Sequence, residues 1–272
     1  MRITYVGHAT LLIDVAGLRI LTDPNFDSSL GRVLARVTQP GIAIDQLPPL
    51  DAILLTHAHA DHLSFKTLAM LPQHIPLYAP AAIARWLVRK GYRHAVGVDP
   101  DETISLGRGA LRIHVGSATH RGSRFGLDWW RSAANMYLME SDEASVFFAG
   151  DTALTDTSHA LVERVLWENT RSLDVALLPI GYAPPWKPGF RRGHLTAADA
   201  LALFARLRAS VMMPYHWGTF RHVTATAYDA INQLRKELET HADRTRVRII
   251  EPGQTLVMDD TPGKRTSGLL SH

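Results

Sequence analysis

Cysteine is absent from this 272-residue chain, as are long apolar runs and any large excess of charge of one sign. Without cysteine there is no disulfide, no thiolate nucleophile, no Cys-ligated zinc and no iron–sulfur cluster. No apolar stretch approaches the roughly 20 residues that span a bilayer. The first residues also lack the apolar core of a signal peptide. We therefore expect a cytoplasmic protein without a transmembrane segment.

The order of apolar patterns predicts one domain built from two sheets with helices outside. Strands are predicted over 3–5, 11–15, 18–20, 51–55, 111–115, 136–139, 146–149, 175–178, 211–213, 247–250 and 255–257, and helices over 80–91, 160–167, 196–207 and 228–238. The pair Thr196 and Asp199 has the spacing of a capping box. The aperiodic stretch 25–50 carries enough apolar residues to pack on the domain. We predict a single domain over 1–258 and a flexible C-terminal tail over 259–272.

The strongest chemical pattern is the run from His57 to His62, which reads His-Ala-His-Ala-Asp-His directly after the buried strand predicted at 51–55. Histidine both binds metals and titrates near neutrality, but most of the 14 histidines here need no special role. Three imidazoles and one carboxylate within six residues are too many for a single tetrahedral ion that also takes ligands from elsewhere. The pattern predicts a metal site, with its side chains divided between two ions.

Three further residues repeat one arrangement, an apolar strand followed by a turn and a metal-ligand side chain. His120 follows the strand at 111–115, Asp151 follows 146–149 and His216 follows 211–213. Side chains on loops at strand ends are well placed to meet in one crevice. We expect these three to complete the metal site.

These residues resemble the metallo-β-lactamase superfamily of dinuclear metal hydrolases, through the His-x-His-x-Asp-His motif, the Gly-Asp-Thr that contains Asp151, and the late His216. Further stretches resemble the branch of L-ascorbate-6-phosphate lactonase-like proteins and N-acyl-phosphatidylethanolamine phospholipase D, namely VGHAT at 6–10, LTDP at 21–24, LPPLD at 47–51, LPIG at 178–181, HLTAAD at 194–199 and HWGTF at 216–220. The resemblance implies an α/β (α+β) fold, the four-layer αββα sandwich of that superfamily. The Asp-His-Leu-Ser at 61–64 departs from the Asp-His-x-Gly-Gly of thioester- and β-lactam-hydrolysing relatives, so neither activity is expected.

The same resemblance assigns seven ligands to two divalent ions: the first ion is held by His57, His59 and His120, the second by Asp61, His62 and His216, and both by Asp151. Two such ions about 3.5–4 Å apart make a bridging hydroxide available at neutral pH. Asp61 is also a candidate catalytic residue that orients the nucleophile or accepts its proton. We expect Zn²⁺, with Mn²⁺ or Fe as alternatives, because His and Asp ligands suit all three.

Three residues near the motif have open roles. By the resemblance, His194 lies beside the substrate as a second catalytic candidate, where it would bind an anion or protonate a leaving group; otherwise it is a structural residue at a helix start. Asp23 either fixes the tautomer of a metal-binding imidazole or caps a turn before Pro24. His8 is either a packed histidine or a support for the metal ligands.

Positive charge is concentrated in two segments beside the predicted site. The segment 117–131 has a net charge of +2 and 186–194 of +3, which leaves −2 for the rest of a chain whose total is +3. Arginine suits bidentate recognition of phosphate or carboxylate, and tryptophans lie among these cations. We predict a small anionic, partly apolar substrate bound by Arg124, Arg191, Arg192 and Trp186.

The leading hypothesis is a dinuclear metal-dependent hydrolase of a phosphodiester or related anionic ester. One alternative is a lactonase acting on a phosphorylated or acidic sugar lactone. A nuclease is disfavoured because the sequence has no long basic stripe, so we do not expect nucleic acid as a partner. A third alternative is a metal-retaining binding protein without turnover. The oligomeric state cannot be read from the sequence.

Overall fold

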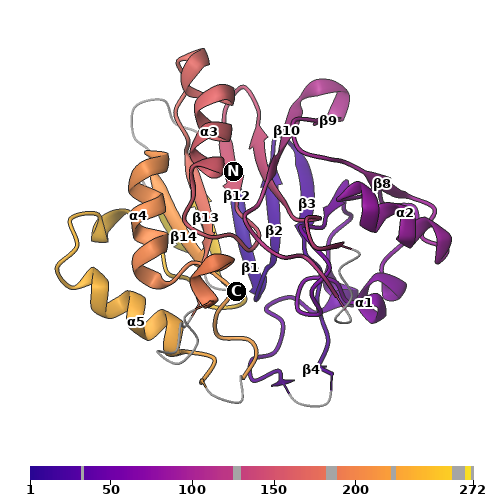
Figure 1. Cartoon of the computed structure of the whole chain (residues 1–272), viewed down its shortest axis with the longest axis horizontal. Helices are drawn as coiled ribbons and strands as arrows, with labels where there is room; N and C mark the ends of the chain where they lie inside the picture. The colour runs from indigo at the N-terminus through magenta and orange to yellow at the C-terminus, as the bar shows by residue number, and fades with distance from the viewer. Residues whose placement is uncertain (32–33, 125–129, 182–188, 222–224, 259–266, 271–272) are drawn as a thin grey trace.

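Two sheets lie face to face between outer helices (Figure 1). The computed structural model describes residues 1–31, 34–124, 130–181, 189–221, 225–258 and 267–270. The strand order of the first sheet is β16-β15-β1-β2-β3-β6-β7-β8, and that of the second is β14-β13-β12-β11-β10-β9. A separate hairpin joins β4 (Ser29–Leu30) and β5 (Leu34–Ala35).

The strands of the first sheet are β1 (Arg2–Gly7), β2 (Thr10–Val15), β3 (Leu18–Thr22), β6 (Ala52–Leu54), β7 (Leu77–Ala79), β8 (Ala95–Gly97), β15 (Thr255–Met258) and β16 (Ser267–Leu270). Those of the second are β9 (Thr103–Leu106), β10 (Leu111–Ser117), β11 (Asn135–Glu140), β12 (Ser145–Phe148), β13 (Val175–Pro179) and β14 (Val211–Tyr215). The helices are α1 (Phe65–Met70), α2 (Ala81–Arg89), α3 (Asp156–Val165), α4 (Ala197–Leu207) and α5 (Asp229–Leu238).

The predicted four-layer αββα arrangement is confirmed by the way the apolar residues are shared. Tyr5 and Ile13 of the first sheet belong to one buried cluster with Phe148 of the second, so the sheets pack on each other. Ile53 on the outer side of the first sheet packs in a second cluster that includes Leu87 of α2. Helices α3 and α4 lie against β10, β11 and β13 on the far side, and Figure 1 shows them opposite α1 and α2.

Helix α4 begins as the sequence predicts. The hydroxyl of Thr196 accepts a hydrogen bond from the backbone N–H of Asp199, and the Asp199 carboxylate accepts one from the backbone N–H of Thr196. The predicted capping box is therefore present, and it fixes where the chain turns from the loop that contains His194 into the helix.

Two of the predicted terminal elements differ in the structure. The apolar run 247–250 makes only an isolated bridge, between Val247 and Met212, rather than a strand, because burial of Val247 and Ile250 in the core does not require a hydrogen-bonded ladder. Ser267–Leu270, which lies in the predicted tail, pairs with β15 as β16, a strand that the sequence did not predict, and the flexibility of the tail stays a prediction. The division at residue 258 stays a prediction.

The stretch 25–50 packs on the domain as expected. Arg36 and Phe220 form an isolated antiparallel β-bridge, and the backbone N–H of Val37 donates a hydrogen bond to the carbonyl of Thr219. The Arg36 side chain donates to the carbonyls of Asn25 and Asp27, so it ties the start of this stretch to its hairpin. This packing places Asn25 beside the loop of the main motif.

Candidate metal centre

The predicted ligands lie at the carboxyl ends of strands that run in one direction. β1, β3 and β6 share one direction in the first sheet, as β10, β12, β13 and β14 do in the second. The ligand-type residues follow these strands: His8 after β1, Asp23 after β3, His57, His59, Asp61 and His62 after β6, His120 after β10, Asp151 after β12, His194 after β13 and His216 after β14. The structure brings the side chains of eight of them into two groups at this end of the sheets.

One group of four residues comprises His57, His59, His120 and Asp151, whose ligand atoms lie within 4.8 Å of one another. His59 Nδ1 lies 3.0 Å from His120 Nε2. Among the residues that the structure describes, His57 Nε2 and Asp151 Oδ1 are buried without a hydrogen-bond partner. Because a buried polar atom rarely lacks a partner, these two atoms suit a cation held among the imidazoles.

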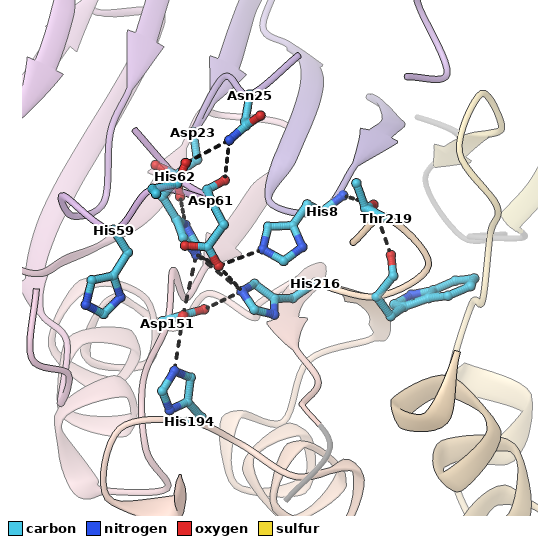
Figure 2. A network of polar contacts seen from close by, with 12 residues as sticks. His8, Asp23, Asn25, His59, Asp61, His62, Asp151, His194, His216 and Thr219 are labelled. Atoms are coloured by element: carbon cyan, nitrogen blue, oxygen red, sulfur yellow. Dashed lines mark hydrogen bonds and ion pairs between the residues drawn. The ribbon is translucent and has the colours of Figure 1, made fainter. Parts of the chain in front are cut away.

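A second group comprises His8, Asp61, His62 and His216, whose ligand atoms also lie within 4.8 Å of one another. His62 Nε2 lies 3.3 Å from His216 Nε2, which in turn lies 3.6 Å from Asp61 Oδ2. Asp151 lies 3.5 Å from His62 and 3.4 Å from His216, and it also belongs to the first group. Figure 2 shows Asp61 and His62 of the loop after β6 pointing toward Asp151 and His216, which follow β12 and β14. Asp151 is thus placed to serve two ions.

The electrostatics of the two groups fit cations as well. Burial lowers the pKa of His57 well below its usual value and that of His120 to about 4, which leaves both imidazoles neutral and able to ligate. Burial alone would raise the pKa of Asp151, but the histidines around it lower it well below the usual range. Burial would lower the pKa of His62, yet the carboxylates of Asp151, Asp61 and Asp23 raise it well above normal. The carboxylates therefore place negative charge around His62. A proton on His62, or a metal ion in place of that proton, neutralises this charge.

Asp23 resolves one of the open roles. Its fully buried carboxylate accepts hydrogen bonds from Thr56 N (2.7 Å) and Thr56 Oγ1 (2.6 Å), and His62 Nδ1 lies 2.8 Å away. Because the carboxylate accepts the proton on Nδ1, Nε2 is the nitrogen of His62 that faces the site, where it carries a proton or would bind an ion in place of that proton. Asp23 thus orients the imidazole of His62, a predicted metal ligand, and the loop that carries it.

His120 is oriented in a similar way by the backbone. Its Nδ1 lies 2.7 Å from the carbonyl oxygen of Gly193, so the Nδ1 proton is donated there and Nε2 faces His59. A Cβ at Gly193 would lie 3.0 Å from this same Nδ1. Glycine therefore permits the close approach of this loop to the metal ligand.

The loop from His57 to His62 is held at both sides. Asn25 Nδ2 donates to the carbonyls of Ala60 (2.9 Å) and Asp61 (3.2 Å), a contact that the sequence did not predict (Figure 2). Arg124 Nη1 donates to the carbonyls of Ala58 and Leu63 on the other side. The position of Asn25, two residues beyond Asp23 at the end of the same strand, is the signal that could have identified it.

The predicted substrate residues are placed differently from the metal ligands. Arg124 clamps the loop and stacks over Phe65, with its guanidinium carbon 4.5 Å from the ring centroid. Arg191 and Arg192 are both exposed, and the guanidinium of Arg191 donates two hydrogen bonds to the carboxylate of Asp199 in the α4 capping box. Trp186 lies outside the described residues. Substrate contact by all four stays a prediction.

His194 does reach the site. Its Nε2 lies 3.6 Å from Asp151 Oδ2, its ring packs edge-on against His120 at 4.8 Å between centroids, and about a third of its side chain is exposed. His194 therefore lies beside the first group and is partly exposed, and its role toward a substrate stays a prediction.

The chain is similar in sequence and in fold to known hydrolases. The chain is 27% identical over 256 residues to an N-acyl-phosphatidylethanolamine-hydrolyzing phospholipase D from Caenorhabditis elegans. The aligned region covers 86% of this chain and 68% of the relative. It is 28% identical to a metal-dependent hydrolase from Exiguobacterium sp., covering 94% of this chain and 99% of that one. Its fold matches the crystal structure of an isothiocyanate hydrolase from Delia radicum gut bacteria with a TM-score of 0.77 at 20% identity, covering 96% of this chain and all of the other.

Within the part of the chain that the structure describes, no helix has both the length and the apolar character to cross a membrane. Residues 18–217 match the Beta-lactamase superfamily domain, a span that runs from β3 to the residue after His216. Since this match covers most of the chain and the two groups of metal-ligand residues lie at the expected strand ends, the protein belongs to the metallo-β-lactamase superfamily of metal-dependent hydrolases.

Proposed function

We propose that this protein is a dinuclear metal-dependent hydrolase of a phosphodiester or a related anionic ester. The observation that carries the proposal is the pair of adjacent four-residue groups with Asp151 between them. The ligands of the first ion are His57, His59 and His120, those of the second are Asp61, His62 and His216, and Asp151 is common to both. Zn²⁺ fits this all-His/Asp set, as do Mn²⁺ and Fe.

The residues of the chain divide the work of hydrolysis. Bound ions at such a pair of sites lower the pKa of water and polarise the scissile bond. Asp61, whose side chain is about a quarter exposed, faces the crevice and orients the attacking water or accepts its proton. His194 borders the first group and donates a proton to the leaving group. The remaining ligands hold fixed positions because Asp23, Gly193 and Asn25 fix their tautomers and their loop.

The substrate class rests on charge and on one relative. The C. elegans relative is named for hydrolysis of N-acyl-phosphatidylethanolamine, a lipid phosphodiester. The Arg-rich segments beside the site add positive charge, and Arg192 in the second segment is exposed to solvent. We therefore expect an anionic ester that also has an apolar part.

The test combines metal analysis with a panel of substrates. Purified protein is analysed for metal content, stripped with a chelator, and reloaded with Zn²⁺, Mn²⁺ or Fe²⁺ before assays with bis-p-nitrophenyl phosphate, N-acyl-phosphatidylethanolamine and a set of acidic lactones. We expect two ions per chain and turnover of the phosphodiesters that disappears on stripping. Turnover of lactones alone would replace the phosphodiesterase assignment with the lactonase, and two bound ions without turnover of any ester would support a binding protein.

Asp151→Ala is the matched variant, because this change removes the residue common to both groups. We expect it to retain fewer than two ions and no activity. Asp142→Asn, an exposed change away from the site, should leave both unchanged. Fewer than two ions in the unmodified protein under saturating metal would refute the dinuclear proposal.

A further inference from the structure

His8 is the one member of the two four-residue groups that has no assigned role in the proposed metal centre. It follows β1 at the same edge as the ligands, and only 5% of its surface is exposed. Its Nε2 lies 3.0 Å from Asp61 Oδ2, and its ring lies 3.8 Å from that of His216 between centroids (Figure 2). His8 therefore contacts two of the three residues that belong to the second ion alone.

The backbone holds His8 in this place at a conformational cost. Both His8 (φ 56°) and His216 (φ 73°) adopt the left-handed region, which is uncommon for residues other than glycine. The N–H of His8 donates to Thr219 Oγ1 at 2.7 Å, and its carbonyl accepts from the N–H of His216 at 3.0 Å. The two residues are thus joined by a hydrogen bond, and the backbone of His8 is held at both its N–H and its carbonyl.

Asp61 is more exposed than the other ligand-type residues around it, His62, His216 and Asp151. Its side chain is about a quarter exposed, whereas that of His62 is fully buried and that of Asp151 almost so. A carboxylate at the edge of a crevice has more freedom of rotation than a buried one, and fixing it costs conformational entropy. In the first group His57 and Asp151 are buried, and the half-buried His59 has its Nδ1 3.0 Å from His120 Nε2. The contacts of His8 with Asp61 and His216 concern the second group.

We propose that His8 is a positioning residue that donates its Nε2 proton to Asp61 Oδ2 and so holds Asp61 ready to bind the second metal ion. This inference rests on the proposed dinuclear function. The two ions then bind unequally: the first enters the group of His57, His59, His120 and Asp151 without help from His8, and the second depends on the His8–Asp61 hydrogen bond. Loss of a residue that orients a metal ligand typically costs about 10–100-fold in metal affinity.

The proposal is tested by Zn²⁺ titration calorimetry on the stripped full-length protein, with metal content measured in parallel. His8→Asn is the main variant, because asparagine tolerates the left-handed backbone better than other residues while its short amide does not reach Asp61. His8→Gln is the matched variant, because its amide nitrogen lies farther from the backbone, at about the distance of Nε2. Circular dichroism and thermal unfolding establish that each variant is folded.

We expect two binding events in the unmodified protein. In His8→Asn the tighter event should be unchanged and the weaker one about 10–100-fold weaker, and His8→Gln should restore most of the loss. Binding of both ions by His8→Asn as tightly as by the unmodified protein would overturn the proposal, and so would equal weakening of both events. A folded His8→Gln variant as weak as His8→Asn would rule out the donor role. If the unmodified protein binds fewer than two ions, the dinuclear function itself fails, a separate result.

Discussion

His62 Nδ1 lies 2.8 Å from Asp23 Oδ2, and both side chains are completely buried. The same carboxylate accepts two hydrogen bonds from Thr56, so three donors converge on its two oxygens. One aspartate at the end of β3 thereby determines the direction of a ligand on the loop that follows β6. Because these two strands are neighbours in the sheet, the register between β3 and β6 becomes part of the metal site.

We predict that Asp23→Asn weakens binding of the second ion by about 10–100-fold, because the amide group turns one acceptor into a donor that opposes Thr56 or His62. Zn²⁺ titration of the stripped variant measures the effect. Asp14→Asn, a change of the same chemistry at a partly exposed residue paired with Arg19, is the control and should bind both ions normally. Normal binding by Asp23→Asn would mean that His62 is oriented by its packing alone.

The sequence indicates the seven proposed ligands because each of them follows an apolar run that predicts a strand. The structure brings all seven into two adjacent groups. His8 follows β1 in the same way, but the sequence pattern does not distinguish a ligand from a histidine that supports one. That distinction depends on the 3.0 Å contact with Asp61, 53 residues away in sequence.

The arginines illustrate what the sequence could not supply. Charge density predicted substrate contacts for Arg124 and Arg191, but each guanidinium has acceptors within the protein, on the carbonyls of the motif loop and on Asp199. These partners are set by how the loops fold over the sheet ends, which no local pattern encodes. The same limit applies to β16, whose existence depends on the open edge of β15 rather than on its own composition.

Gly193→Ala should weaken binding of the first ion. Its new Cβ would lie 3.0 Å from His120 Nδ1, so either the imidazole or the loop must shift, and the 2.7 Å hydrogen bond to the Gly193 carbonyl would be strained or lost. We expect about a 10–100-fold lower affinity for the first ion in a metal titration. Gly189→Ala is the matched control in the same segment, since a Cβ there meets nothing within 4 Å. Equal behaviour of the two variants would show that the site tolerates the displacement.

His194→Ala tests the proposed proton donor. General acid catalysis typically contributes about 10²–10⁴-fold, and it matters most when the leaving group is a poor one. We expect kcat to fall by such a factor for a phosphodiester with an alkyl leaving group and to change little for bis-p-nitrophenyl phosphate. Two ions per chain should remain, because His194 is outside the proposed ligand set. An equal fall for both substrates would assign His194 to substrate binding or to the structure of the loop.

The capping box of α4 fixes the end of the loop that carries Arg191 and His194. Burial alone would raise the pKa of Asp199, but hydrogen bonds from Arg191 and Thr196 outweigh burial and lower the pKa below its usual value. A carboxyl group with a depressed pKa in the folded state stabilises the protein above its unfolded pKa of about 3.9, and this contribution disappears as the pH falls through the folded value. Asp199→Asn should therefore lower the free energy of unfolding by about 1 kcal/mol at pH 7, as the loss of a helix cap does.

Urea unfolding of the metal-stripped protein at pH 7 and at pH values below 4 measures this difference without interference from bound ions. The gap between Asp199→Asn and the unmodified protein should shrink as the pH falls through the folded pKa of Asp199, because protonation then removes the same charge from the unmodified protein. Asp142→Asn, at an exposed position, should show no gap at either pH. A difference for Asp199→Asn that stays constant down to the lowest pH would mean that the cap acts through the shape of the side chain and not through its charge.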